Sequence, residues 1–167
     1  METQELVTLL ARWLHIFSAI ALVGGTVFIR FALVPALAGA DGEGVDDSVS
    51  GAIYRRWTRI VMVAIAWLLI TGIYNAAIMA VRYDLGPVYN ALLGIKMLLA
   101  FVIFALASLL AGRSALARRL RTRERTWLNL NLLLMVVLIS IASFLKQMDP
   151  PPRTASASPD SAATEME

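Results

Sequence analysis

The sequence predicts an all-α membrane protein built as a bundle of four transmembrane helices. Hydrophobic residues make up 59% of the 167-residue chain and charged residues only 16%, whereas soluble domains are nearer half apolar and a quarter charged. Four apolar segments approach the roughly 20 residues that a helix needs to cross a bilayer. No alternating strand pattern accompanies them. We therefore expect one helical domain over residues 1–148.

The four segments justify this expectation in turn. The first runs over about 9–37, interrupted only by Arg12, His15 and Arg30, and the others cover about 60–81, 91–111 and 127–145. Residues 149–167 are rich in Pro, Ser and Ala and have few large apolar side chains. Such a composition cannot bury a core, so we expect a disordered, outward-facing tail.

The basic residues predict the orientation. Four spans place both termini on one side, where four Lys and Arg residues lie, against nine on the other side. Basic residues stay cytoplasmic, so both termini are expected in the periplasm of a bacterial inner membrane. The basic residues lie between apolar segments, which does not suit nucleic-acid binding. The nine are Arg55, Arg56, Arg59, Arg113, Arg118, Arg119, Arg121, Arg123 and Arg125; the four are Arg12, Arg82, Lys146 and Arg153.

The residue inventory limits the chemistry. The chain has no cysteine and one histidine, which excludes disulfides, thiolate metal sites and cysteine nucleophiles. It also holds no catalytic triad, phosphate loop or zinc motif. We therefore expect a protein that is not an enzyme.

Polar residues inside the spans are the candidate site, because they are costly in a bilayer and tend to face the bundle interior. His15, Asn75, Lys96 and Ser143 each lie near the outer end of a different span. Helical spacing predicts that the last three form a polar cluster level with His15. Thioethers lie near the same end at Met79, Met97 and Met148.

Each of these residues also has a plainer interpretation. His15 can anchor the helix at the interface beside Trp13, and the Lys96 side chain can extend to the headgroups. Serine hydroxyls often bond their own helix backbone, and methionines often only pack. Asn75 needs hydrogen-bond partners, which neighbouring helices could supply.

Three segments resemble the first three helices of copper resistance protein D domains: "WLHIFSAIALVGGTVFIRFALVPAL" (13–37), "RRWTRIVMVAIAWLLITGIYN" (55–75) and "LGIKMLLAFVIFALASLLAGR" (93–113). The resemblance implies copper uptake or tolerance in the inner membrane, with a periplasmic copper-binding protein as partner. Cu(I) favours imidazole and thioether ligands, so His15, Met79 and Met97 would form the site. Larger members have more helices, and this chain lacks additional histidines and a dense methionine cluster.

A second resemblance is to the four-span haem-biosynthesis family that oxidises protoporphyrinogen. That family has a first-helix histidine and a third-helix lysine, which match His15 and Lys96. The resemblance implies haem b, with His15 as axial ligand and Lys96 paired with a propionate or donating a proton. Gly24 and Gly25 stand where that family has an aromatic motif. A third hypothesis is a non-catalytic membrane subunit, with lipid and a second copy of the chain as partners.

Overall fold

The computed structural model is an all-α bundle, which confirms the predicted fold class. It describes residues 3–39, 47–112, 119–120, 122–148 and 150–152. The long helices of this part of the chain are α1 (Thr3–Phe28), α3 (Asp47–Arg82), α4 (Pro87–Ala111) and α6 (Glu124–Gln147). Helix α1 continues through the π-helix η1 (Ile29–Leu33) into α2 (Val34–Gly39). Within the described residues, four helices are long and apolar enough to cross a membrane.

A proline explains the π-helical turn after α1. Pro35 has no backbone N–H to donate, and its ring disturbs the carbonyl one turn earlier in a regular α-helix. The turn just before it widens, so that the backbone N–H of Val34 donates to the carbonyl of Ile29, five residues back. Such single wide turns interrupt α-helices without ending them. The first span therefore remains one helical rod despite the proline.

The helices extend beyond the apolar segments that predicted them. Helix α3 begins at Asp47, well before the expected start near residue 60, because hydropathy marks only the apolar part of a longer helix. Helix α4 starts one residue after Gly86, with Pro87 in its first turn, where a missing N–H costs nothing. Most of the predicted tail, 153–167, lies outside the described residues.

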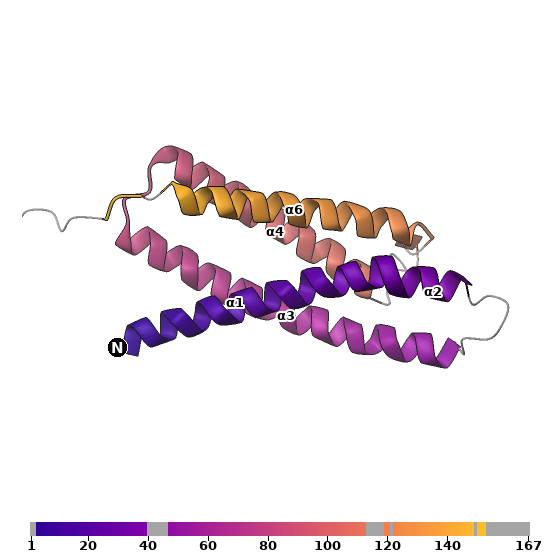
Figure 1. Cartoon of the computed structure of the whole chain (residues 1–167). Helices are drawn as coiled ribbons and strands as arrows, with labels where there is room; N and C mark the ends of the chain where they lie inside the picture. The colour runs from indigo at the N-terminus through magenta and orange to yellow at the C-terminus, as the bar shows by residue number, and fades with distance from the viewer. Residues whose placement is uncertain (1–2, 40–46, 113–118, 121, 149, 153–167) are drawn as a thin grey trace, which may run out of the picture.

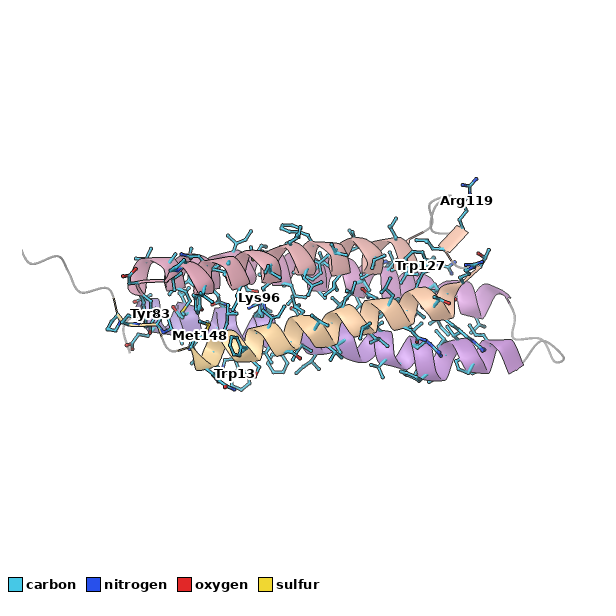
Figure 2. All side chains as sticks on the ribbon, turned by 90° about the horizontal axis from the view of Figure 1, so that it is seen from above. Trp13, Tyr83, Lys96, Arg119, Trp127 and Met148 are labelled. Atoms are coloured by element: carbon cyan, nitrogen blue, oxygen red, sulfur yellow. The ribbon has the colours of Figure 1, made fainter. Side chains whose placement is uncertain are left out.

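The two ends of the bundle differ in what they carry (Figure 1). The start of α1, the α3–α4 turn and the end of α6 share one end, here named the termini end. The opposite end, named the arginine end, holds α2, the start of α3, the end of α4 and the start of α6. Figure 2 shows Trp13 toward the termini end and Trp127 toward the arginine end, the pattern of aromatic residues at two membrane interfaces.

The four helices pack as two pairs, α1 with α3 and α4 with α6, which make the most extensive contacts. In the first pair, the ring of Trp57 occupies the space beside Gly25 that a Cβ atom would need. A glycine at this point lets the two helices approach closely. The most buried side chains are Val61, Ile103 and Asn131, one each from α3, α4 and α6.

Side-chain hydrogen bonds join the two pairs only toward the arginine end of the described bundle. Arg30 Nε donates to Asn129 Oδ1 (2.6 Å), and Thr58 Oγ1 donates to the carbonyl of Ala111 (2.5 Å). The Tyr54 hydroxyl likewise donates to Glu124 (3.0 Å). Toward the termini end, the side-chain hydrogen bonds between described helices stay within the α1–α3 pair. The described links between the pairs at this end are the covalent 83–86 turn from α3 to α4 and a backbone hydrogen bond from Asp84 N–H to the carbonyl of residue 151 (3.0 Å). The two helix pairs are therefore joined more strongly at the arginine end than at the termini end.

Candidate functional site

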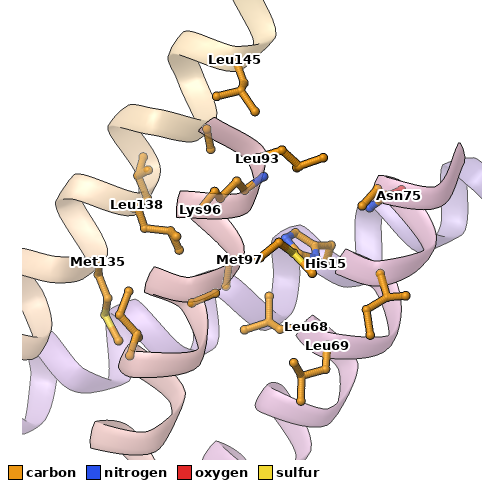
Figure 3. Close-up of a pocket in the computed structure, with 18 of the residues that line it drawn as sticks. His15, Leu68, Leu69, Asn75, Leu93, Lys96, Met97, Met135, Leu138 and Leu145 are labelled. Carbon is orange, nitrogen blue, oxygen red and sulfur yellow. The ribbon is translucent and has the colours of Figure 1, made fainter. Parts of the chain in front are cut away.

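The half of the bundle nearer the termini end encloses a cavity of about 530 Å³. Side chains from α1, α3, α4 and α6 all line it, and Figure 3 shows part of this lining. The volume falls within the roughly 300–1,000 Å³ of cavities that hold small organic ligands. A bare metal ion needs far less room. The cavity is thus sized for an organic molecule.

Five of the six site residues that the sequence predicts line this one cavity. They come from three helices, and they are His15, Asn75, Met79, Lys96 and Met97. His15, Asn75, Lys96 and Met97 are labelled in Figure 3, where they surround the same space. The predicted convergence of polar groups and thioethers therefore holds for α1, α3 and α4.

The placement of Ser143 was wrong. Its side chain is exposed and does not line the cavity. The residues of α6 that are buried or line the cavity instead recur at alternating steps of three and four. They are Leu128, Asn131, Met135, Leu138, Ala142 and Leu145. The face carrying Ser140 and Ser143 is rotated away from it, because each residue turns an α-helix by about 100°. Ser140 bonds its own backbone, at the carbonyl of Val136 (2.9 Å), as the plainer interpretation expected.

A hydrogen bond to α3 fixes the His15 side chain. The imidazole Nδ1 lies 2.9 Å from the hydroxyl oxygen of Thr71. The same hydroxyl lies 2.5 Å from the carbonyl of Trp67, to which it donates. A threonine hydroxyl has one proton, and here Thr71 donates it to the carbonyl oxygen of Trp67. The hydroxyl oxygen of Thr71 therefore accepts a hydrogen bond from Nδ1–H of His15.

This assignment leaves the other imidazole nitrogen free. With the proton on Nδ1, Nε2 carries a lone pair, and no described residue is hydrogen-bonded to it. A Cβ placed on Gly72 would lie 3.5 Å from Cε1 and 4.0 Å from Nδ1, so this edge of the ring rests against α3. Metal-binding histidines are oriented in the same way, through a hydrogen bond from the nitrogen that does not bind the metal. His15 is therefore arranged to offer Nε2 as a ligand.

Sequence reasoning missed two further lining residues with polar side chains, Tyr89 and Lys146. Tyr89 is buried, and it belongs to the stripe of α4 that contains Leu93, Lys96 and Ala100. Extending that stripe back by two steps would have found it. Lys146 follows the buried Leu145 at the end of α6 and is exposed. No periodic signal marks it, because it stands at the edge of the lining face.

The lining is apolar with a positive bias. Lys96 and Lys146 are its two lysines, and none of the described lining residues is acidic. The described residues also hold no group of three or more His, Asp or Glu side chains that could bind a metal ion. Apart from thioethers, His15 is then the main metal ligand the cavity offers. The arrangement suits a molecule with an apolar body and acid groups.

Comparison with known proteins adds no relative. No protein-family model, curated protein or solved structure matches the chain. The resemblances to the copper resistance and haem-biosynthesis families therefore stay predictions.

Proposed function

We propose that this membrane protein binds haem b, or a closely related tetrapyrrole, with His15 as the axial ligand of the metal. One observation carries the proposal: the only histidine of the chain lines a cavity of about 530 Å³, with Nδ1 bonded to Thr71. Haem proteins commonly hold the iron through one imidazole. When bound, haem would supply redox chemistry, while the chain would orient the imidazole and exclude water.

The charges of the lining support an acidic ligand. Haem carries two propionates, and the cavity offers lysines at positions 96 and 146 with no described acid to neutralise them. Lys96 is half-buried and Lys146 is exposed, so one could pair inside the cavity and the other at its edge. Charge-assisted hydrogen bonds of this kind are about twice as strong as neutral ones.

An absorption spectrum tests this proposal. The protein, purified after expression with a haem precursor, should show a Soret band. His15→Ala should abolish the band, and added imidazole should restore part of it by entering the space left behind. The matched control is Trp13→Ala, on the same helix but outside the cavity lining. A haemin titration that gives no His15-dependent shift of the Soret band would eliminate haem.

Copper is the second candidate, because Met79 and Met97 line the same cavity as His15. Imidazole and thioether ligands suit Cu(I). Against this, Lys96 and Lys146 place positive charge around a cation, and the cavity is much larger than an ion. Titration with Cu(I) should show weaker binding in Met97→Leu and Met79→Leu, with Met62→Leu as the control outside the lining. Equal affinity in all three variants would remove the methionines from a copper site.

The orientation is also a proposal. The four spans make the protein multi-pass, and the excess of arginine at the arginine end supports a cytoplasmic location for that end. Both termini would then face the outside of a bacterial inner membrane. The cavity, in the half nearer the termini end, would lie in the outer half of the bilayer.

A further inference from the structure

We propose that the cavity exchanges its ligand with the lipid bilayer, through the lateral gap between α1 and α6 bordered by Ile16, Ile20 and Ile139. The ligand would then be a membrane-dissolved amphipath with an acid group. The identity of that ligand as haem rests on the proposed function, whereas the route rests on the packing of the helices.

The three border residues both line the cavity and are exposed. Ile16, Ile20 and Ile139 line the cavity, yet 54%, 61% and 54% of these side chains are exposed. An exposed side chain that also lines the cavity lies in the wall between the cavity and the exterior. All three lie within membrane-spanning helices, so that exterior is the acyl-chain region. Their apolar character suits passage of an apolar body, since lipid-exposed polar groups would be costly there.

The packing explains why the gap lies in this half of the bundle. Side-chain hydrogen bonds between the two helix pairs lie toward the arginine end, including the bond between Arg30 and Asn129 that joins the first span to α6. On the cavity side, His15 and Thr8 bond to α3 within their own pair. Helix α1 makes fewer contacts with α6 than with α3. The α1–α6 seam is thus held at one end and can widen at the other.

The opposite seam is less free to open. Ile73 of α3 and Phe101 of α4 are also exposed lining residues. However, the short 83–86 turn joins α3 directly to α4 at the termini end. Residues 151–152 lie against this turn, through the backbone bond from Asp84 to residue 151. Among the described residues, no turn and no backbone hydrogen bond joins α1 to α6 at this end.

The lining sets the chemistry of the molecule that enters. Most lining side chains are aliphatic or aromatic, whereas Lys96 and Lys146 supply positive charge. Lys146, exposed in the last turn of α6, can meet an acid group at the interface before the apolar body passes between the isoleucines. Lysine side chains commonly span from an apolar region to headgroups in this way.

Cross-linking across the gap tests the route in a chain that has no native cysteine. The variant Ile20→Cys with Ile139→Cys would be joined by a short bis-maleimide, and haemin transfer from loaded vesicles would be followed at the Soret band. The matched control is Val27→Cys with Leu130→Cys, on the same two helices but outside the lining. A third pair, Ile73→Cys with Phe101→Cys, closes the opposite seam.

We expect the first cross-link to slow loading at least about tenfold and to leave the equilibrium affinity unchanged, because closing a route slows entry and exit together. The control cross-link should leave the rate unchanged. Equal rates in the first pair and the control would overturn the route, as would slowing only by the third pair.

A second measurement needs no haem and separates failure of the route from failure of the proposed function. A nitroxide at Leu138→Cys, in the lining, should be relaxed by oxygen dissolved in the bilayer more than by a water-soluble nickel chelate. The reference is Leu98→Cys, whose native side chain is 67% exposed. Stronger relaxation of the Leu138→Cys label by the nickel chelate would show entry from water and overturn the route. Absence of a His15-dependent Soret band would remove haem alone.

Discussion

The imidazole of His15 and the hydroxyl of Thr71 form a 2.9 Å hydrogen bond that joins α1 to α3 at the wall of the cavity. Thr71 is buried, and its own proton is directed to the carbonyl of Trp67. One threonine therefore sets the tautomer and the direction of the only histidine. This relationship predicts how a change in α3 alters binding at α1.

We expect Thr71→Val to lower haem affinity by about 10–100-fold, the usual cost of losing such an orienting partner. It should also destabilise the bundle by about 1–3 kcal/mol, since a partly buried imidazole N–H loses its acceptor. Haemin titration and unfolding in mixed micelles would measure the two effects. Thr71→Ser keeps the hydroxyl and serves as the control. Equal losses of affinity in both variants would contradict an orienting role for the hydroxyl.

Two adjacent glycines provide the next prediction. A Cβ at Gly25 would overlap the ring of Trp57, whereas a Cβ at Gly24 would meet nothing within 4 Å. Gly25→Ala should therefore lower the free energy of unfolding by about 1–3 kcal/mol, the typical cost of overpacking. Gly24→Ala should raise it by up to about 1 kcal/mol, because alanine favours helix over glycine. Unfolding with SDS in mixed micelles would compare the two variants.

Replacing Trp57 by a smaller side chain checks the cause of the stability loss in Gly25→Ala. Combining Gly25→Ala with Trp57→Leu should recover part of the loss, because the side chain that overlaps the new methyl is gone. If Gly25→Ala is no less stable than Gly24→Ala, the close contact between α1 and α3 at this point is wrong.

How much of the site could be read from the sequence depended on the helix. In α4, the polar residue Lys96 lies on the true inner stripe, so choosing the polar residue also chose the correct face. In α6, the serines drew the prediction to Ser143, while the inner stripe carries Asn131, the most buried polar residue of that helix. Neither polar atom of the Asn131 side chain has a hydrogen-bond partner among the described residues. Polarity alone therefore selected the exposed face of α6 instead of the buried face.

Contacts between helices were the part that sequence periodicity could not supply. Periodicity placed His15 on an inner face, but it could not show that Thr71 would stand opposite. The pairing of α1 with α3 depends on the fit of Gly25 to Trp57, which lie 32 residues apart in sequence. The fold class was easier to predict, because bilayer thickness sets a length that apolar segments reveal one at a time.

Labelling of single cysteines tests the orientation. In whole cells, a membrane-impermeant maleimide should label Gln147→Cys at the end of α6 and leave Thr122→Cys, before α6, unlabelled until the membrane is permeabilised. Both native side chains are exposed, so the variants form a matched pair. The expectation follows from the arginine excess near residue 122. Labelling in the reverse order would place the termini in the cytoplasm.

Lys96 distinguishes the two ligands proposed for the cavity. Replacing the half-buried ammonium by an apolar side chain that is not a metal ligand, Lys96→Leu, removes a cation from the lining. Haem affinity should fall on the order of tenfold, since a charge-assisted hydrogen bond to an acid group is lost. Binding of the dimethyl ester of haem, which has no acid groups, should change little. Cu(I) affinity should instead rise, because a like charge near the ion is gone. Parallel titrations of the variant with haemin, its ester and Cu(I) would measure these opposite signs, and unchanged affinity for haemin would show that Lys96 does not contact the ligand's acid groups.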